Sequence, residues 1–352
     1  MVANARTHPP ERVHLVHDAA SGLDGTIVLH STALGPAAGG CRFWAYDSPD
    51  AVAIDASRLA EGMSYKNALA GLPLGGGKAV LRRPDGPFDR EALFRAFGRA
   101  VRELEGRYVT AEDVGTSVAD MQVVAGETHH VAGLTVQPGR PGGDPSPWTA
   151  RGVFLSMQLA AERRLERPLS DCTVAIQGVG HVGAQLARML HAAGATLVIS
   201  DINSAAVARV AGETGATIAS LTAIDSLPAD IFAPCALGGV LNHRTIGKLA
   251  AKVVCGAANN QLAEPEDGAR LADRNVLYAP DYVVNAGGII NVAAEYLNWS
   301  AVDAERRVED IAARLAHVLE HARNRSVPTN AAADDLARGM IARGVAKASI
   351  AA

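Results

Sequence analysis

Hydrophobic positions in the first hundred residues follow the period of a strand and then the period of a helix. Residues 13–18 (VHLVHD) and 26–32 (TIVLHST) are short apolar runs joined by the turn sequence SGLDG, which predicts two strands. In residues 89–104 the apolar side chains recur at steps of three and four, which predicts an amphipathic helix with one buried stripe. The segments around these elements, 35–42 and 64–80, are too rich in glycine to be ordinary core.

The middle of the chain has the pattern of a strand, a glycine turn, a helix and a second strand. An apolar run at 173–176 leads into GVGHVG (178–183), a helical stretch, a second apolar run at 197–199, and Asp201. Glycines at this spacing allow a tight turn, close approach of a pyrophosphate to the backbone, and close packing of helix on strand. The sequence therefore predicts a dinucleotide site, although such a turn can also serve packing alone.

The acid at the end of the second strand indicates which dinucleotide would bind. Asp201 lies 18 residues after Gly183, close to the spacing at which a carboxylate reaches the ribose hydroxyls of the adenosine. A carboxylate in that position would repel a 2′-phosphate. We therefore expect NAD rather than NADP.

Later apolar runs predict the rest of a mostly parallel sheet. They lie at 231–236, 252–255, 276–278 and 282–284, and polar or helical stretches separate them. A long helix should follow with Ser300 as its N-cap, end at SVPTN, and be succeeded by a final helix from about residue 331.

The strongest break in the chain is QPGRPGGDPSP, 137–147, which predicts a hinge between two domains. We expect a substrate-binding α/β domain at 1–136 that the last helix, about 331–352, rejoins. We expect a Rossmann-type, doubly wound dinucleotide domain at 148–330.

Composition excludes several classes of function. The 352 residues carry a net charge of −4, which predicts no strong attraction to nucleic acid or to an anionic membrane. The four cysteines have no metal-site or disulfide spacing, and the pair His129-His130 lacks further ligands, so no metal is expected. The first residues contain no apolar leader core, which favours a cytoplasmic protein.

Two lysines in the glycine-rich segments are candidates for chemistry. Lys66 lies in GMSYKNALA, and Lys78 follows three glycines. A lysine among small apolar residues loses hydration, which disfavours its charged form, so that it can act as a general base. A companion that stays charged can hold a substrate carboxylate. The alternative is that one or both are ordinary solvated lysines.

Three further polar positions follow apolar runs. Asp113 in TAEDVGTS could face a cleft and exchange protons, or could merely stabilise a turn or cap a helix. The stretches GAANNQ, 256–261, and NAGGII, 285–290, resemble strand ends at the ligand crevice of a doubly wound sheet. Their amides could bind ligand groups or serve only as turn residues.

The chain contains the motifs GPAAGGCR, YKNALAGLPLGGGKAV, RYVTAEDVGTS, DPSPWTARGV, GVGHVG, FAPCALGGV, GAANNQL and YAPDYVVNAGGIINV. Taken together, these motifs resemble the leucine, valine and phenylalanine dehydrogenase branch of the amino acid dehydrogenase superfamily. The resemblance extends from about residue 13 to about residue 345. It implies the reversible, NAD-dependent oxidative deamination of a hydrophobic L-amino acid to its 2-oxo acid, ammonia and NADH. It also implies a homo-oligomer. Because water should be excluded during hydride transfer, we expect the two domains to close over the cleft around the hinge at 137–147.

Roles follow from the same resemblance. Lys78 resembles the general base that activates water, and Asp113 its proton-transfer partner. Lys66 resembles the ligand of the substrate carboxylate, with help from the Gly40 backbone, and Asn259 resembles the family residue near the amino group and nicotinamide. The side-chain pocket is expected to be lined by Ala38, Ile289 and Val292. The positions expected around the cofactor are Arg42, Ser146, Thr149, Gly178, Val179, Gly180, His181, Val182, Gly183, Asp201, Ile202, Ala236, Leu237, Ala257 and Asn259.

The exact substrate is left open by the sequence. Ala38 resembles the phenylalanine enzymes, whereas INV at 290–292 resembles the leucine and valine branch. A dehydrogenase of another amino acid, such as tryptophan or glutamate, is an alternative. A catalytically silent NAD-binding regulatory module would be expected to have lost Lys66, Lys78 or Asp113. A 2-hydroxy acid dehydrogenase would need a catalytic histidine in a convincing context.

Overall fold

The computed structural model describes residues 9–135 and 141–351, and only the backbone of residues 347–351. The chain forms two compact units. The first contains the described residues up to Asp144, Asn291–Ala304, and those from Ala337 onward; the second contains Pro145–Ile290 and Glu305–Leu336. Residues 291–304 thus belong with the first unit, whereas the sequence groups them with the dinucleotide half. Residues 137–140 of the expected hinge lie outside the described residues.

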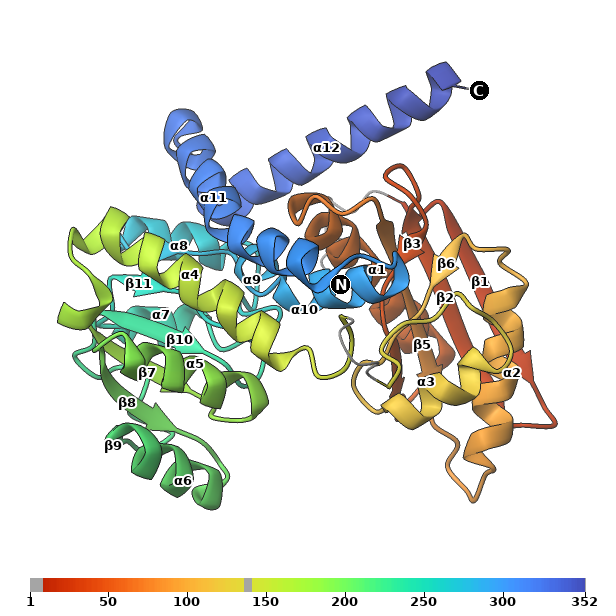
Figure 1. Cartoon of the computed structure of the whole chain (residues 1–352), viewed down its shortest axis with the longest axis horizontal. Coiled ribbons are helices and arrows are strands. Elements are labelled where there is room, and N and C mark those ends of the chain that lie inside the picture. Colours follow the sequence, from red (N-terminus) through yellow and green to blue (C-terminus); the bar gives the residue numbers. More distant parts are fainter. Residues whose placement is uncertain (1–8, 136–140, 352) are drawn as a thin grey trace. The chain divides into compact units, whose positions relative to one another are not determined.

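The first unit is built on a mixed sheet with the order β1-β2-β5-β3-β6, with β4 also paired to β5 (Figure 1). Its strands are β1 (Arg12–Asp18), β2 (Leu23–Ser31), β3 (Ala37–Ala38), β4 (Cys41–Trp44), β5 (Gly75–Arg82) and β6 (Tyr108–Val109). Its helices include α1 (Pro49–Leu69), α2 (Arg90–Arg102) and α3 (Val118–Ala125). The predicted pair of strands is confirmed as the antiparallel hairpin β1–β2, in which Val13 lies opposite Val28.

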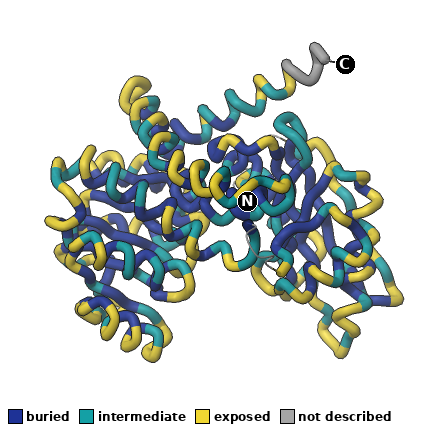
Figure 2. The backbone as a smooth tube through the Cα atoms, in the orientation of Figure 1, coloured by how far each residue is buried: buried dark blue, intermediate teal, exposed yellow. Residues whose placement is uncertain are grey.

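The predicted amphipathic helix is confirmed as α2. Its apolar stripe is buried, with Phe94, Phe97 and Val101 fully inaccessible to solvent. Phe94 packs edge-on against Phe43 of β4, with ring centroids 5.6 Å apart. Figure 2 shows that the strands are mostly buried and that the helices are buried along one face. Helix α2 therefore covers one face of the sheet, as its hydrophobic period requires.

Helix α1 is not predicted by the apolar pattern. Its buried face consists mainly of small residues four positions apart, Val52, Ala56, Ala60 and Ser64, which give little hydrophobic contrast. Ser48 caps its first turn by accepting the Ala51 N–H at 3.2 Å, with proline at the next position. The small face allows close packing on the sheet, and α1 carries Lys66 in its last turn.

The second unit contains an all-parallel sheet with the order β12-β11-β10-β7-β8-β9. Its strands are β7 (Thr173–Gln177), β8 (Thr196–Ser200), β9 (Thr217–Ile218), β10 (Ile231–Pro234), β11 (Val253–Val254) and β12 (Leu277–Tyr278). Its helices include α4 (Ser146–Leu165), the short turn η1 (Leu169–Asp171), α5 (His181–Ala192), α6 (Ser204–Thr214), α7 (His243–Lys248) and α8 (Asp267–Asp273). Counted from β7, this is the strand order of a Rossmann-type dinucleotide fold, so the predicted fold class is confirmed.

One predicted strand is wrong. Residues 282–284 lie in the short helix α9 (Asp281–Val284), and the stretch 285–290 leads into α10 (Gly287–Tyr296) instead of ending a strand. Asp281 fixes this turn, because its carboxylate accepts the Asn260 N–H at 2.8 Å and the Tyr278 hydroxyl at 2.5 Å. An apolar run of three residues fits a helix turn as well as a strand.

The chain ends in α11 (Ala301–Arg325) and α12 (Thr329–Ala351). Ser300 is the N-cap of α11, as predicted, because its hydroxyl accepts the Asp303 N–H at 3.1 Å. In the first unit, Arg338 of α12 lies over the Tyr65 ring of α1, 5.8 Å from its centroid. Within the described residues, no helix is long and apolar enough to cross a membrane.

Candidate active site

The first unit brings Lys78 and Asp113 together. Lys78 Nζ lies 2.8 Å from Asp113 Oδ2, and only 6% of the lysine side chain is exposed, against 26% of the aspartate. Lys78 is in the middle of β5, where it pairs with Val28 of β2. It is therefore a buried amine in contact with one carboxylate, and the solvated-lysine alternative does not apply to it.

Glycines before Lys78 allow neighbouring elements to approach β5. A Cβ added to Gly76 would lie 2.1 Å from the backbone nitrogen of Ser64 in α1, and one added to Gly39 would lie 1.9 Å from the Gly77 oxygen. No side chain fits at either place. The glycine run thus sets the backbone spacing that encloses Lys78.

The loop after β6 fixes Asp113. Its N–H donates to Thr116 Oγ1 at 2.8 Å, and the Thr116 N–H donates to the Asp113 carbonyl at 3.0 Å. The helix that follows is capped by Ser117, so Asp113 is not an N-cap. Burial of the carboxyl opposes its ionisation, but Lys78 and then Arg42 outweigh burial and lower the pKa of Asp113 below its usual value. Asp113 is therefore an anion at neutral pH.

The two predicted ligands of the substrate carboxylate lie in the same unit. Lys66 is half-buried in the last turn of α1, where its neighbour Asn67 donates to the Gly75 oxygen at 2.5 Å and the Ala38 oxygen at 3.3 Å. A Cβ added to Gly40 would lie 2.9 Å from the Asp113 Cβ. Gly40 is thus immediately beside the acid, with its backbone close to the proposed chemistry.

The second unit contains the glycine turn in the form that a dinucleotide needs. Gly178 has φ +98°, which favours glycine, and a Cβ on Gly183 would lie 2.0 Å from the Gly178 oxygen. A Cβ on Gly180 would meet nothing within 4 Å, and no side chain caps the N-terminus of α5 there. His181 and Val182 form the first turn of α5. The turn therefore offers backbone N–H groups and open space to a pyrophosphate.

Asp201 follows β8 and is tied to the same turn. Its Oδ2 accepts the Val179 N–H at 2.7 Å, and its Oδ1 accepts the Asn203 N–H at 2.9 Å. Ile202, next to it, is almost fully exposed. The carboxylate is therefore held beside the glycine turn, where an adenosine ribose would lie in a fold of this kind.

Other predicted cofactor positions follow the neighbouring parallel strands. Ala236 and Leu237 are exposed after β10, and Ala257 and Asn259 follow β11. Asn285 Nδ2 donates to Asn259 Oδ1 at 2.8 Å and to the Ala257 oxygen at 3.1 Å. Because the carboxyl ends of parallel strands share one edge of the sheet, these residues lie at the edge that carries the glycine turn.

Three predicted cofactor residues lie on other elements. Ser146 is buried and Thr149 half-buried in the first turn of α4, and the Thr149 hydroxyl donates to the Pro145 oxygen at 3.0 Å. Arg42 is on β4 in the first unit, where it binds Asp113 and Asp55. Contact between any of these residues and a cofactor stays a prediction.

Sequence motifs did not identify Asp55, Tyr46 or Thr116, which support Arg42 and Asp113. Asp55 is on α1, the helix that the apolar pattern missed, and no motif connects it with Arg42. The signal that could have located α1 is Ser48-Pro49, an N-cap followed by proline.

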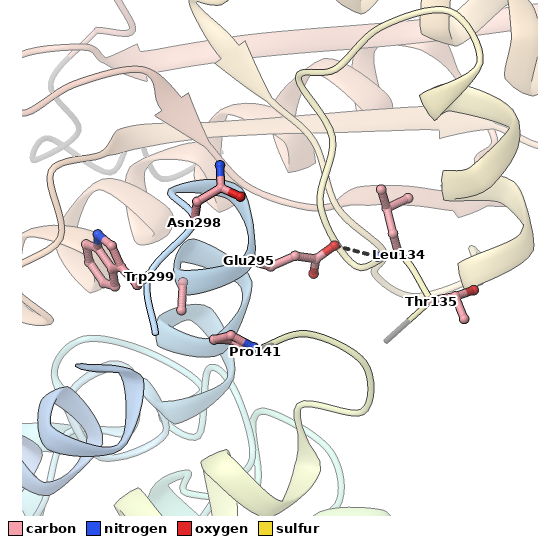
Figure 3. Close-up of a pocket in the computed structure, with 7 residues that line it drawn as sticks. Leu134, Thr135, Pro141, Glu295, Asn298 and Trp299 are labelled. Carbon is pink, nitrogen blue, oxygen red and sulfur yellow. Dashed lines mark hydrogen bonds between the residues drawn. The ribbon is translucent and has the colours of Figure 1, made fainter. Parts of the chain in front are cut away.

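The residues predicted to line the substrate pocket are Ala38, buried on β3, and Ile289 and Val292, half-buried on α10. Figure 3 shows a different pocket, of about 160 Å³, in the first unit. Its lining residues are Leu134, Thr135, Pro141, Ala294, Glu295, Asn298 and Trp299. Glu295 points towards the loop and accepts the Leu134 N–H at 2.9 Å. Among the described residues, none of those predicted for catalysis lines this pocket.

Two family models match the chain. The family model "Glu/Leu/Phe/Val dehydrogenase, dimerisation domain" matches residues 10–130. The model "Glutamate/Leucine/Phenylalanine/Valine dehydrogenase" matches residues 144–225 and 203–348.

Similar proteins match over nearly the whole chain. A leucine dehydrogenase of Geobacillus stearothermophilus is 46% identical over 95% of this chain and 91% of its own length. A valine dehydrogenase of Streptomyces coelicolor is 47% identical over 94% of this chain and 92% of its own. The crystal structure of L-tryptophan dehydrogenase from Nostoc punctiforme aligns with a TM-score of 0.84 and 39% identity, covering 95% of this chain and 96% of the other. The chain belongs to the Glu/Leu/Phe/Val dehydrogenase family and is a nicotinamide-dependent amino acid dehydrogenase.

Proposed function

We propose that this chain catalyses the reversible, NAD-dependent oxidative deamination of a hydrophobic L-amino acid to its 2-oxo acid and ammonia. The observation that carries the proposal is the buried Lys78, whose Nζ lies 2.8 Å from Asp113 Oδ2. A lysine and an acid in contact can pass a proton between them, which deamination requires at more than one step.

The proposed residue roles follow from this geometry. Lys66, as an ammonium, binds the carboxylate of the substrate, and the Gly40 backbone supports it. The substrate ammonium first loses a proton to Asp113. A bound nicotinamide would then supply a hydride acceptor for the substrate Cα–H. Lys78, in its uncharged form, then takes a proton from water as the water oxygen attacks the resulting iminium carbon.

Asp113 completes the proton transfer. The carbinolamine breaks its C–N bond, the nitrogen gains a proton and leaves as ammonia, and the hydroxyl proton is lost as the carbonyl forms. Asp113, ionised and in contact with Lys78, exchanges these protons with the lysine. The direction of the pKa shift of Asp113 supports this role, because only the anion can orient a protonated amine.

We propose NAD as the preferred dinucleotide. Both oxygens of Asp201 already accept backbone N–H groups, so the carboxylate has a fixed position beside the glycine turn. A 2′-phosphate there would meet a fixed negative charge, whereas ribose hydroxyls can donate to it.

We propose a hydrophobic substrate because relatives on two branches, named for leucine and valine, match this chain almost equally. A solved relative named for tryptophan supports a pocket that can accept a large side chain. One methylene in such a pocket is worth only about 1–3 kcal/mol, so we expect activity on several hydrophobic amino acids.

The test is the rate of NADH formation with Leu, Val, Ile, Phe, Tyr, Trp and Glu, with NADP in parallel. Activity on one or more hydrophobic amino acids, and little on Glu, is expected. Lack of turnover with every amino acid would favour the silent regulatory module, and faster reaction with NADP would refute the role given to Asp201.

A further inference from the structure

The carboxylate of Asp113 has a second cationic neighbour, and an acid on another element holds that cation. Arg42 Nε lies 3.3 Å from Asp113 Oδ2, the same oxygen that Lys78 approaches. At its other end, Arg42 NH1 donates to Asp55 Oδ2 at 2.9 Å. The guanidinium therefore connects an acid in the loop after β6 with an acid on α1.

Asp55 is itself firmly held. The Tyr46 hydroxyl donates to Asp55 Oδ2 at 2.6 Å, and Arg58 NH2 donates to Asp55 Oδ1 at 2.9 Å. The Asp55 side chain is only 17% exposed, whereas Arg58 is 57% exposed on the solvent side of the pair. Both carboxylate oxygens thus have partners, and the position of Asp55 determines where the Arg42 guanidinium lies.

The backbone brings these elements together. Arg42 pairs with Val80 in the parallel β4–β5 ladder, two residues beyond Lys78. The Cys41 N–H donates to the Ala111 oxygen at 2.7 Å, and the Phe43 N–H to the Val114 oxygen at 2.9 Å. The backbone therefore positions the loop, while Lys78 and Arg42 orient its carboxylate.

Two basic side chains face two acids in the less exposed part of this group, and a third basic side chain lies on its solvent side. Lys78 and Arg42 face Asp113 and Asp55, and Arg58 adds a cation towards solvent. Two further titratable groups near Asp113 are the Cys41 thiol and the Tyr108 hydroxyl, and burial raises the pKa of each, so both stay neutral. Tyr46 also stays neutral, since burial and then Asp55 raise its pKa to about 12.

We propose that Asp55 is a positioning residue for the deamination: acting through Arg42, it keeps the Asp113 carboxylate oriented and ionised beside Lys78. The inference rests on the proposed roles of Lys78 and Asp113. It assigns Arg42 to the proton-transfer acid, whereas the sequence resemblance places Arg42 at the cofactor.

The sign of the expected pH effect follows from the charges. Without Asp55, Arg42 loses the acceptor of its NH1 group and moves away from Asp113. An opposite charge within a few ångströms lowers the pKa of an acid, so losing it raises the pKa of Asp113. Asp55 has a negative charge of its own, whose removal acts in the opposite direction, but Arg42 is in direct contact and Asp55 lies beyond it. The acidic limb of the activity profile should therefore move to higher pH.

The experiment compares kcat and kcat/KM against pH for wild type, Asp55→Ala, Arg42→Met and the double variant, in the full-length protein. For Asp55→Ala we expect kcat to fall about tenfold and the acidic limb to move up by about one pH unit. KM for the amino acid and for NAD should change by less than about threefold. Arg42→Met should produce the same shift of the acidic limb. The double variant should have nearly the same kcat and the same shift as each single variant, because both changes act through the contact between Arg42 and Asp113.

The Arg82–Asp24 pair provides a matched control. Arg82 is at the end of β5, and its Nε donates to Asp24 Oδ2 at 2.9 Å, away from the Lys78 pair. Asp24→Ala removes an ion pair of the same type and should leave kcat and the acidic limb unchanged. If Asp55→Ala does not fold, as judged by its Tm, Asp55→Ser is measured instead.

The outcomes separate the two hypotheses. A loss of activity that is equal at every pH, additive effects in the double variant, or wild-type kinetics in Asp55→Ala would each overturn the role of Asp55. If Arg42→Met raised only the KM for NAD, Arg42 would be a ligand of the cofactor, and the role of Asp55 would be overturned as well. An inactive wild type would instead refute the proposed function itself.

Discussion

At the scale of single residues, the site depends on a lysine, Lys78, that has little contact with water. A buried ion pair contributes little net stability, because the cost of desolvating both charges offsets their attraction. The Lys78–Asp113 pair is therefore better explained by chemistry than by stability. The same reasoning separates Lys78 from surface lysines, which can be changed with little effect.

Replacing Lys78 should separate catalysis from cofactor binding. We expect Lys78→Ala to lower kcat by about 10²–10⁴-fold, because the general base is lost, while NADH still binds to the second unit. Initial rates and the fluorescence of bound NADH measure the two effects. Lys252→Ala, at an exposed position, is the control and should match wild type in both. Wild-type kcat in Lys78→Ala would show that another group is the base.

Lys78 and Asp113 could be singled out as candidates from the sequence, because Lys78 follows three glycines and Asp113 follows the strand-like run 108–110. The Arg42–Asp55 pair could not be predicted. Its members are 13 residues apart on a strand and on a helix, and their contact at 2.9 Å arises from tertiary packing. Motifs single out residues beside glycines and near strand ends, whereas ion pairs between elements leave no periodic signal.

At the scale of elements, patterns with strong contrast were predicted correctly. The β1–β2 hairpin, α2, the glycine turn with α5, and the cap of α11 all have clear apolar periods or cap residues. Helix α1 was missed because its buried face is mostly alanine and serine, and α9 was mistaken for a strand because its apolar run is three residues long. Both errors reflect weak local contrast that tertiary packing overrides.

Two of the three glycines of the α5 turn, Gly183 and Gly180, should respond differently to substitution. Gly183→Ala places a Cβ 2.0 Å from the Gly178 oxygen, so α5 must move and both Tm and NADH binding should fall. Gly180→Ala meets nothing within 4 Å and has an ordinary φ of −68°, so the fold should be kept. Its methyl group would lie where the pyrophosphate approaches, and we expect NADH binding to weaken at an unchanged Tm.

Thermal unfolding and NADH titration distinguish these two glycines. The control is Gly212→Ala in α6, where an added Cβ also meets nothing within 4 Å. Because glycine is unfavourable in a helix interior, this variant should be more stable than wild type by about 1 kcal/mol, and its NADH binding should be unchanged. Normal NADH binding by Gly180→Ala would mean that the pyrophosphate does not approach the backbone there.

At the scale of the whole molecule, the two sheets differ at their edges. In the described residues, β1 is an edge of the first sheet and is seven residues long, whereas β9, an edge of the second, has only two. Leu15 and Val13 are on the same face of β1 and are 81% and 47% exposed. A long edge strand with exposed apolar side chains is a surface that proteins usually cover.

The family model that covers this unit is a dimerisation domain, so a second copy of the chain is the expected cover. Because a twofold interface uses the same patch on both subunits, Leu15→Glu would place two charges in it. We expect this variant to have a lower molar mass than wild type by size-exclusion chromatography with light scattering. Ile218→Glu, at the 57% exposed edge position on β9, should keep the wild-type mass. A monomeric wild type, or an unchanged mass in Leu15→Glu, would show that β1 is not the contact, since neither result is compatible with an apolar edge buried between subunits.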